Sequence, residues 1–600
     1  MSDPGPTSPG LSSRLAKLNP FSKSTPKHSH EADDEDQGEE IDPASVAGGG
    51  HSTRPTDITS HKLQVSSALQ AFLVSDGVLP SEPGNTASAL HELLEKPHVS
   101  VPASVTDRSH PLPEYYISSS HNTYLLAHQL FGSSSASAYE TALNAGARCV
   151  EIDAWDNPDN IDEPKVTHGY TLVSNITFRA VCETIRDVVD RQSAASDATA
   201  TPIMLSLENH CGDNGQRRLV AIMKEVFGSC LLDSPIETAS DGESHVTLAD
   251  LVSKVVVIVE YHLPNEASDS SSSSSSSESE DETEKQARHE YQAKKKAAPP
   301  TIIIPELAQL GVYAQSVKPA DDSWFTSLLK NAPHHHLINV SETGLSAPMA
   351  AHAAKISRHN ANHLMRVFPK GTRISSRNLP PVPFWALGAQ ICALNWQTFG
   401  ASMQLNEALF AGTDGYVLKP AALRAGGDGV ISSDGKKKRL KLRVAGASGV
   451  PLPNGREVGE IRPYLTCTML APRHERVSGG LIVDSIKRKT GVYKQSKLKM
   501  AGAFLRHPHG DLESEKPPLE TDPVWDETLE WEFEDSELVF VRMLVKSDDS
   551  FASNPILAVA AVRLMYVTPG WSFVRMLDLK GRETKCSVLV RFDVEDVCDT

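Results

Sequence analysis

The sequence predicts a multidomain protein in which an α/β barrel of the (β/α)8 type, split by an insert, precedes an all-β sandwich. Its 600 residues are enough for about three to five domains. Strand-like and helical segments alternate over 109–260 and resume over 302–424, as in a parallel α/β sheet or barrel. After Arg424 the segments become β-rich throughout, which indicates an antiparallel sandwich.

The first half of the predicted barrel is the more regular. Its strand-like segments are Tyr115–Ser119, Cys149–Trp155, Ile203–Glu208 and Val255–Val259. Helices are expected at Ala138–Ala147, Phe178–Asp190 and Gln216–Phe227. The second helix places Phe178, Val181, Ile185, Val188 and Val189 on one face, and Gly228 follows the third helix, where glycine commonly ends a helix.

The second half of the barrel supplies four further strand-like segments: Leu337–Val340, Met365–Phe368, Gln390–Asn395 and Tyr416–Leu418. Four strands from each half would close one eight-stranded barrel. The intervening segment 268–298 is rich in Ser and charged residues, so we expect it to be disordered.

The remaining segments complete the expected organisation. Residues 1–57 are rich in Ser, Pro, Gly and acidic residues and are expected to be disordered. Two weakly helical patches follow, Leu63–Leu73 and Ala87–Leu94, and the loop between them lacks the alternating carboxylates of a calcium-binding loop. Eight β-rich runs form the predicted sandwich: RLKLRVAGA, YLTCTMLA, GGLIVDSIK, LEWEFED, LVFVRMLVKS, ILAVAAVRL, FVRMLDL and CSVLVRFDV.

The formal charge of −18 is concentrated in two acidic tracts. Segment 31–42 holds eight acidic residues, segment 266–284 holds seven, and neither holds a basic residue. Without these 15, the chain has 61 acidic and 58 basic residues. The rest of the protein is therefore nearly neutral, and its overall charge does not exclude an anionic membrane as a partner.

Other sequence features limit the class of protein. The apolar runs are far shorter than the ~18 residues of a membrane span, and the start, MSDPGPTSPG, lacks the apolar core of a secretory signal peptide. Eight cysteines without a CxxC pair indicate reduced thiols in the cytosol. We therefore predict a cytoplasmic protein that meets membranes from their surface.

Polar residues at the ends of successive barrel strands form the candidate site. They are His121 and Asn122, Glu151 and Asp153, His168 in the following segment, and Glu208 and Asn209. Carboxylate and amide oxygens suit calcium or magnesium, and two histidines beside such a cation suit phosphodiester cleavage. A single histidine here is more often structural, and a Glu-x-Asp pair is more often an interior salt bridge. Their recurrence at successive strand ends favours a functional site.

The strings SSSHNTYL, CVEIDAWD, HGYT, LSLENHC, ALNWQT and GYVLKPAALR resemble the catalytic X and Y halves of eukaryotic phosphoinositide-specific phospholipase C, most closely the delta-like form. The resemblance covers about 109–424 and a C2-like sandwich at 437–596. It implies a split TIM-type barrel with X half 109–262, linker 263–300 and Y half 301–424. An EF-hand-like remnant at 58–108 would precede it, without a pleckstrin-homology domain, and a linker at 425–436 would lead to the C2-like domain at 437–600.

The resemblance also implies an activity and its residues. The enzyme would cleave phosphoinositides, phosphatidylinositol 4,5-bisphosphate or less phosphorylated forms, to diacylglycerol and inositol phosphate through a cyclic phosphate, in intracellular lipid signalling. Ca²⁺ would be held by Asn122, Glu151, Asp153 and Glu208. Glu151 would act as general base, His168 would protonate the leaving group, and His121 would stabilise the transition state. Ser341, Arg366 and Phe368 would contact the headgroup.

Departures from the family pattern concern headgroup recognition. The family has two lysines in the strand before the linker, where this chain has Ile258 and Glu260. Phe368 replaces a usual tyrosine. We therefore predict a reduced preference for polyphosphorylated headgroups, since a charge-assisted contact contributes about 1.5–3 kcal/mol. Two alternatives remain: a pseudoenzyme that binds a membrane or partner, and a phosphodiesterase for another headgroup.

The C2-like domain also departs from calcium-binding relatives, because Arg462 and Ser547 stand where acidic residues are expected. We therefore favour a structural role for this domain. Basic runs at 436–443 and 487–499 are either solvated faces or sites of attraction to anionic lipid. The expected partner is a phosphoinositide-containing membrane surface, bound peripherally by a monomer, with no nucleic acid and an unknown upstream activator. The acidic tract 266–284 is predicted to inhibit basal turnover electrostatically.

Overall fold

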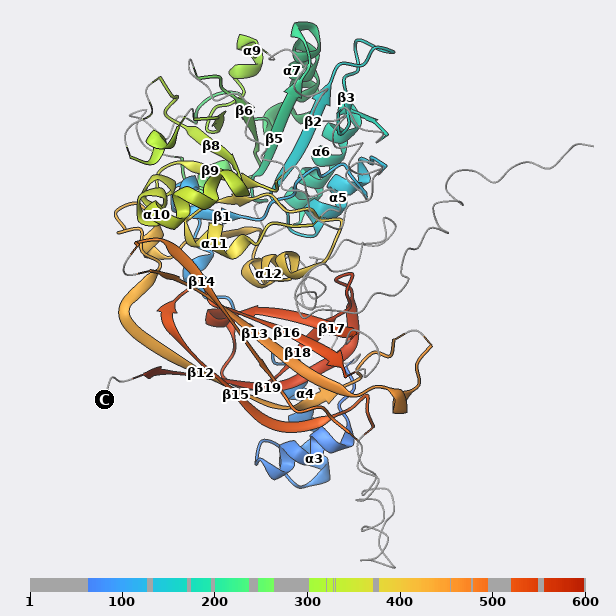
Figure 1. Cartoon of the computed structure of the whole chain (residues 1–600). Helices are drawn as coiled ribbons and strands as arrows, with labels where there is room; N and C mark the ends of the chain where they lie inside the picture. The colour runs from blue at the N-terminus through green and yellow to red at the C-terminus, as the bar shows by residue number, and fades with distance from the viewer. Residues whose placement is uncertain are drawn as a thin grey trace, which may run out of the picture.

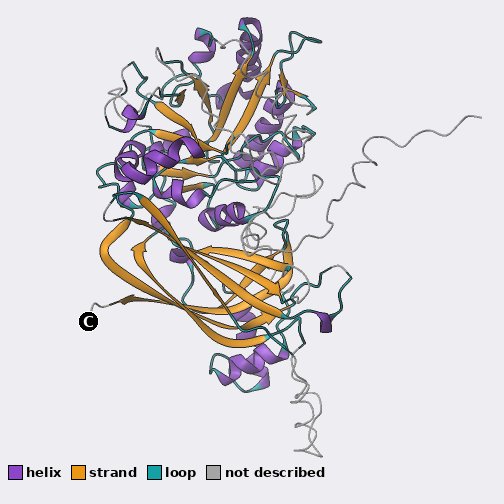
Figure 2. Cartoon of the chain, viewed as in Figure 1, coloured by secondary structure: helices purple, strands orange, loops and turns teal. Residues whose placement is uncertain are grey.

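The structure is a computed structural model that describes residues 63–597 except for 127–132, 170–173, 196–199, 237–245, 264–301, 320, 327–328, 330, 371–376, 454, 476–477, 495–518 and 549–554. The predicted disordered tail, both acidic tracts and most of the linker at 263–300 lie outside the described residues. What the structure describes is an α/β barrel stacked on a β-sandwich (Figures 1 and 2).

Parallel strands close into a barrel, as the sequence predicts. In the described part of the chain the ring has eight strands: β1 (Tyr115–Ile117), β2 (Cys149–Trp155), β5 (Ile203–His210), β6 (Val255–Glu260), β7 (Gln315–Val317), β8 (His336–Ser341), β9 (Leu364–Phe368) and β10 (Ile391–Cys392). A parallel bridge between Ser119 and Cys149 joins the first strand to the second, and β10 pairs with β1, so the ring closes.

One predicted barrel strand is wrong. Tyr416–Leu418 (β11) lies outside the ring and pairs antiparallel with β1. The fourth strand of the second half is instead β7, which lies between β6 and β8. The sequence of β7, QSV, has too little apolar character to be recognised as a strand. The sequence of β11, YVL, is typical of a strand but does not indicate whether the strand runs parallel or antiparallel to its neighbour.

Helices cover the outside of the barrel: α5 (Ser137–Asn144), α6 (Phe178–Ala194), α7 (Asp213–Phe227), α9 (Pro305–Ala308), α10 (Glu342–Asn360), α11 (Pro381–Ala386) and α12 (Ala401–Phe410). The predicted apolar face of α6 is buried along its length. Gly228 ends α7 with a φ of +51°, a conformation that costs glycine little. Two short antiparallel strands, β3 (Lys165–Val166) and β4 (Ile176–Thr177), extend the sheet beyond β2.

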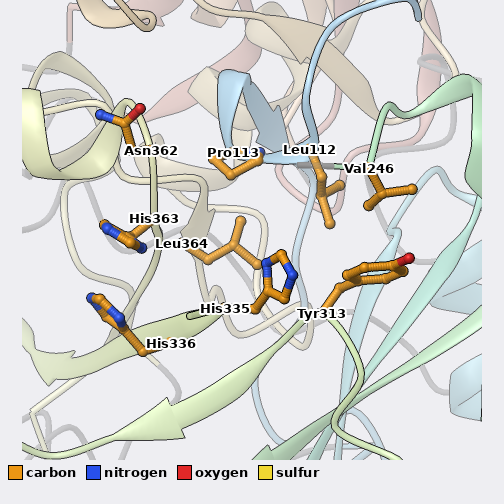
Figure 3. A pocket seen from close by; sticks show the side chains of 9 residues that line it. All are labelled: Leu112, Pro113, Val246, Tyr313, His335, His336, Asn362, His363 and Leu364. Atoms are coloured by element: carbon orange, nitrogen blue, oxygen red, sulfur yellow. The ribbon is translucent and has the colours of Figure 1, made fainter. Parts of the chain in front are cut away.

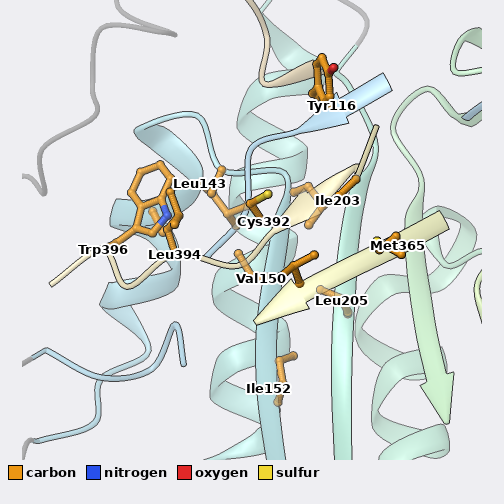
Figure 4. Packing of buried hydrophobic residues seen from close by; sticks show 14 of the residues in the cluster. Tyr116, Leu143, Val150, Ile152, Ile203, Leu205, Met365, Cys392, Leu394 and Trp396 are labelled. Carbon is orange, nitrogen blue, oxygen red and sulfur yellow. The ribbon is translucent and has the colours of Figure 1, made fainter. Parts of the chain in front are cut away.

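Alternation along the barrel strands separates an outer core from an inner one. Outward side chains such as Val150, Ile152 and Leu205 pack under the helices (Figure 4). Inward residues of the first layer, including Cys149 and Met204, form a separate apolar cluster inside the ring. Further along the same strands the inward positions become polar, which places the candidate site at the carboxyl ends of the strands.

Eight antiparallel strands form the sandwich in the described residues, one for each predicted run: β12 (Ser432–Ser448), β13 (Pro463–His474), β14 (Leu481–Lys489), β15 (Val524–Ser536), β16 (Phe540–Ser547), β17 (Ile556–Arg563), β18 (Gly570–Leu577) and β19 (Glu583–Val597). Their spatial order is β14-β13-β16-β17-β18-β19-β12-β15. β17 and β18 share a single register pair, Val559 with Leu577, so this junction divides the strands into two facing sheets around one core.

The two N-terminal helices, α3 (Ser67–Ser75) and α4 (Pro83–Glu95), pack on the sandwich (Figure 1). Leu69 and Leu73 are fully buried against Trp571 and neighbouring side chains of the sandwich. Asp76 accepts hydrogen bonds from Arg443 at 2.7 Å and from the Trp571 indole at 2.9 Å. The module that precedes the barrel in sequence is therefore anchored to the domain that follows it.

The barrel and the sandwich share a packed interface built on α11 and α12. Trp385 of α11 lies 5.9 Å from Phe540 of β16, measured between ring centroids. Arg542 donates to Gln404 of α12 at 2.7 Å, and the Tyr566 hydroxyl donates to the Leu409 carbonyl at 3.2 Å.

Short 3-10 helices occur at 103–105, 112–114, 228–230, 249–251, 322–325, 421–423, 458–460 and 564–566. No helix among the described residues is long and apolar enough to span a membrane.

Candidate active site

Three carboxylates converge at the carboxyl ends of β2 and β5. Glu151 and Asp153 are two residues apart and share the inward face of β2, and Glu208 lies beside Asp153 in the parallel register. Their ligand atoms all lie within 4.8 Å of one another. Glu151 and Asp153 are buried, whereas the Glu208 side chain is 40% exposed, so the cluster is open on one side.

Burial and mutual repulsion oppose ionisation of these carboxyl groups. Burial raises the pKa of Glu151 and Asp153, and the neighbouring carboxylates raise both further. Arg366 acts in the opposite direction on each of them. A cation placed among the three oxygens would relieve the repulsion.

The donor set fits a hard divalent cation. Asp153 Oδ2 accepts a hydrogen bond from Tyr124 at 2.5 Å, but its Oδ1 is buried without a hydrogen-bond partner among the described residues. Such an atom is costly unless something satisfies it. Carboxylate oxygens without sulfur or imidazole in the same cluster match calcium or magnesium rather than zinc.

Asn122 enters the site through a turn just after β1. Its φ of +44° belongs to the left-handed region, which asparagine tolerates better than most residues. Its backbone N–H donates to Glu151 Oε2 at 2.8 Å, and its side-chain Oδ1 lies 3.1 Å from the Tyr124 hydroxyl oxygen. The turn thus places another amide oxygen beside the carboxylates.

His121 is held in one orientation by Asn395. The Asn395 Nδ2 donates to the Arg377 carbonyl at 3.2 Å, so its Oδ1 faces His121 Nδ1 at 2.8 Å. Nδ1 therefore carries the proton, and Nε2 lies 3.9 Å from Glu151 Oε2. Burial, followed by the charge of Arg366, lowers the pKa of His121 to about 4. The imidazole is neutral near pH 7 in the ligand-free site.

His168 reaches the same site from the segment after β3. The neighbouring Thr167 N–H donates to the Asp153 carbonyl at 3.3 Å. A Cβ at Gly169 would lie 1.8 Å from the Trp155 ring, so glycine permits the segment to pack on that ring. His168 is half-buried and close enough for its charge to lower the pKa of His121.

The second half of the barrel contributes Arg366 and its neighbours. Arg366, on β9, forms an ion pair with Glu151, donates to Asn339 at 3.2 Å and lies 3.9 Å from Glu208. Its guanidinium is 5.6 Å from the centre of the Phe368 ring. Ser341 caps α10 by accepting from the Gly344 N–H at 3.1 Å. The side chains of Arg366, Phe368 and Ser341 lie at the same end of the barrel as the carboxylates.

Ile258 and Glu260 both face inward on β6. Ile258 is 2% exposed and belongs to the apolar cluster inside the barrel. Glu260 is half-buried at the carboxyl end of the strand. The two positions where the sequence resemblance led us to expect lysines therefore hold an apolar filler and an anion in this chain.

One candidate residue is not brought to the site. Asn209 follows Glu208 on β5 and so faces the opposite way, where its side chain accepts from the Cys211 N–H at 3.2 Å. Sequence reasoning also missed the supporting contacts made by Asn395, Tyr124 and Asn339. Asn395 stands in the string ALNWQT, but its contact with His121 depends on the closure of the barrel.

At one end of the sandwich, Arg462 and Ser547 lie together, since the Arg462 N–H donates to the serine hydroxyl at 3.0 Å. Residues 495–499 of the basic run at 487–499 lie outside the described residues. In the run at 436–443, four bases form ion pairs with acidic side chains: Lys438, Arg439, Lys441 and Arg443. This strand is therefore largely neutralised within the fold.

Comparisons with known proteins agree with this geometry. Residues 108–261 match the profile of the phosphatidylinositol-specific phospholipase C X domain, and residues 307–422 match that of the Y domain. The 1-phosphatidylinositol 4,5-bisphosphate phosphodiesterase delta-1 of Rattus norvegicus is 28% identical over 545 residues, which cover 88% of this chain and 65% of that protein. A relative from Dictyostelium discoideum, named 1-phosphatidylinositol 4,5-bisphosphate phosphodiesterase, is 30% identical over 530 residues, 82% of this chain and 59% of the relative.

Solved structures show the same architecture. The crystal structure of PLC21 from L. pealei aligns with a TM-score of 0.64 and 25% identity, over 85% of this chain and 60% of that one. The chain spans only 65% and 59% of the lengths of the two curated relatives compared above. With both catalytic halves matched in order around one barrel, the chain belongs to the eukaryotic phosphoinositide-specific phospholipase C family and is delta-like.

Proposed function

We propose that the protein is a Ca²⁺-dependent phospholipase C that cleaves phosphoinositides to diacylglycerol and inositol phosphate. The observation that carries the proposal is the convergence of Glu151, Asp153 and Glu208 within 4.8 Å, with His121 Nε2 3.9 Å from Glu151. Asn122 would complete the set that holds the cation. When bound there, Ca²⁺ lowers the pKa of the inositol 2-hydroxyl and neutralises phosphate charge.

The protein side chains would then move the protons. Glu151 takes the proton of the 2-hydroxyl as this oxygen attacks the phosphorus. The bond from phosphorus to the diacylglycerol oxygen breaks, and His168 protonates that oxygen. A cyclic inositol phosphate results, and water opens it with the proton roles reversed. Each step moves one proton between the reacting oxygen and a side chain at the barrel mouth.

His121 has a different task, which its environment explains. Its Nδ1 is engaged by Asn395 at 2.8 Å, so Nε2 is the atom that faces the reacting centre. To stabilise the pentavalent phosphorus, Nε2 must donate a hydrogen bond. The negative charge of a bound phosphate favours the imidazolium form, so the phosphodiester itself would promote the protonation that this role needs.

The proposed substrates are phosphatidylinositol and its less phosphorylated derivatives in preference to the bisphosphate. Arg366, Ser341 and Phe368 would contact the headgroup, but Glu260 would repel ring phosphates where a lysine would attract them. We infer that the enzyme works as a monomer on the surface of phosphoinositide-containing membranes, on their cytoplasmic side.

The test is hydrolysis of vesicles containing phosphatidylinositol, its monophosphate or its bisphosphate, with Ca²⁺ or with a chelator. The wild type is compared with His168→Ala and with His91→Ala, a matched histidine on α4 far from the site. We expect Ca²⁺-dependent product from the wild type and His91→Ala and little from His168→Ala. Absence of Ca²⁺-dependent product on all three lipids would leave the alternative of a membrane- or partner-binding pseudoenzyme.

A further inference from the structure

A second cluster of side chains lies at the opposite end of the barrel from the carboxylates. His336 begins β8, His359 stands near the end of α10, and His363 directly precedes β9. All three residues are therefore at the amino-terminal end of the strands. One ring nitrogen from each lies within 4.8 Å of the others. The mechanism proposed above uses none of them.

Hydrogen bonds fix the tautomers of two of these rings. His336 Nδ1 lies 3.1 Å from the Pro333 carbonyl, which only accepts, so Nδ1 carries the proton. His359 Nδ1 lies 3.2 Å from Asn360 Oδ1. The Asn360 amide cannot be reversed without losing the bond from its Nδ2 to the Leu387 carbonyl at 2.9 Å. His359 Nδ1 is therefore also the protonated nitrogen.

The two remaining nitrogens face each other with lone pairs. His336 Nε2 and His359 Nε2 are 3.1 Å apart, and two acceptors cannot form a hydrogen bond. A proton or a metal ion between them would satisfy both lone pairs.

A metal ion fits the same separation. With metal–nitrogen bonds of about 2.0–2.1 Å and tetrahedral angles, two imidazole ligands lie ~3.3 Å apart. Ligating histidines usually donate their other N–H to a carbonyl or carboxylate, as His336 and His359 do here. A nitrogen of His363 lies within 4.8 Å of the other two. Because the His363 ring stacks on His336 with centroids 3.9 Å apart, it must turn about its side-chain bonds to direct that nitrogen at the same ion.

We propose that His336, His359 and His363 bind one Zn²⁺ ion, or a divalent transition metal of similar preference. Imidazole nitrogens suit zinc, copper or nickel, and the cluster has none of the oxygen ligands that calcium and magnesium require. The nearby cation is Lys419, whose Nζ donates to the Asn360 carbonyl at 2.9 Å.

A small pocket adjoins the cluster on the side of His336 and His363. Its walls include His335, His336 and His363 (Figure 3). In Figure 3, His363 and His336 lie one above the other on one wall, and Tyr313 lies across from them. The Trp324 ring packs edge-on against His359, with centroids 4.9 Å apart. A metal here would tie the start of β8 to the end of α10, and so stabilise the barrel face remote from the active site.

The test is a calorimetric titration of the metal-free full-length chain, with Zn²⁺ as the only transition metal added. The buffer contains 1 mM Ca²⁺, which occupies the carboxylate cluster. We expect one equivalent of Zn²⁺ per chain and a rise of several degrees in the midpoint of thermal unfolding. Co²⁺ in its place should give visible absorption bands of a site with nitrogen ligands. His359→Gln and His363→Gln should each weaken Zn²⁺ binding ~100-fold.

His334→Gln is the matched control, because His334 is exposed and two residues from His336. It should bind Zn²⁺ as the wild type does, and Asp153→Asn at the other end of the barrel should as well. Melting curves in chelator establish that each variant is folded. A wild-type chain that takes up no Zn²⁺, or His359→Gln and His363→Gln chains that bind it unchanged, would overturn the proposal.

Discussion

The guanidinium of Arg366 donates a hydrogen bond to Glu151 inside the barrel, and each side chain is only 2% exposed. The two residues come from opposite halves of the split barrel, β9 and β2. In the ligand-free protein the proposed headgroup contact is therefore the partner of the proposed general base. Arg366 thus supplies the positive charge that a bound cation would otherwise provide to the carboxylates.

Replacing Arg366 with Met should make stability depend more strongly on Ca²⁺ than it does in the wild type. Removing one partner of a buried ion pair costs about 3–5 kcal/mol, which urea unfolding in chelator would measure. Because the competing positive charge is gone, the variant should bind Ca²⁺ more tightly than the wild type. Arg179→Met, which breaks a more exposed ion pair with Glu225, is the control. Equal losses for both variants, unaffected by Ca²⁺, would contradict this account of Arg366.

His168→Gln should separate proton transfer from cation binding. Loss of a general acid lowers turnover by about 10²–10⁴-fold, while the affinity for Ca²⁺ should stay within a factor of two. The measurement combines turnover on phosphatidylinositol vesicles with Ca²⁺ calorimetry. A variant that retains most of its turnover would remove His168 from the proposed role.

Glu260→Lys should shift headgroup preference toward the bisphosphate. A charge-assisted contact contributes about 1.5–3 kcal/mol, so the ratio of bisphosphate to phosphatidylinositol turnover should rise ~10-fold or more. Mixed micelles at fixed surface concentration measure this ratio. Glu92→Lys on α4 makes the same charge change away from the barrel and should leave the ratio unaltered. A wild-type enzyme that already prefers the bisphosphate strongly would contradict the prediction.

Asp76 should make the attachment of α3 depend on pH. Burial acts to raise the pKa of Asp76, but hydrogen bonds from Arg443 and Trp571 outweigh it and lower the pKa below its usual value. The stabilisation is therefore complete above the unfolded pKa of about 3.9 and is lost as the pH falls through the lower folded value. Asp76→Asn should lower the opening free energy of α3 by about 1–2 kcal/mol at pH 5.

Hydrogen exchange of residues 67–75 would measure that difference, which should shrink at pH 3. Asp187→Asn, an exposed position on α6, should leave exchange in α3 unchanged at both pH values. Equal protection of α3 in wild type and Asp76→Asn at pH 5 would show that this contact does not hold the helix.

Much of this structure could be predicted from the sequence pattern, because local rules determine the parts that were predicted. Glu151 and Asp153 share a face because strand side chains alternate, and the same rule excludes Asn209. The β-rich runs after Arg424 each became a strand. Strand direction has no local signal, so Tyr416–Leu418 was assigned to the barrel and Gln315–Val317 was overlooked.

Contacts between distant segments could not be predicted in the same way. The Arg366–Glu151 pair joins residues 215 positions apart and depends on the closed ring. His359 and His363 have the spacing of one helical turn, but their meeting with His336 depends on the pairing of β8 with β9. The run of three histidines at 334–336 is the signal that could have directed attention there.

The Ca²⁺ dependence of phosphatidylinositol vesicle hydrolysis, compared between the wild type and Asp153→Asn, tests the central claim most directly. The account predicts product from the wild type that a chelator abolishes, and a half-maximal Ca²⁺ concentration at least ~10-fold higher for Asp153→Asn, because a neutral amide replaces a charged ligand. Product formation that is insensitive to chelator, or identical Ca²⁺ curves for the two proteins, would contradict the assignment of the carboxylate cluster as the calcium site of a phospholipase C.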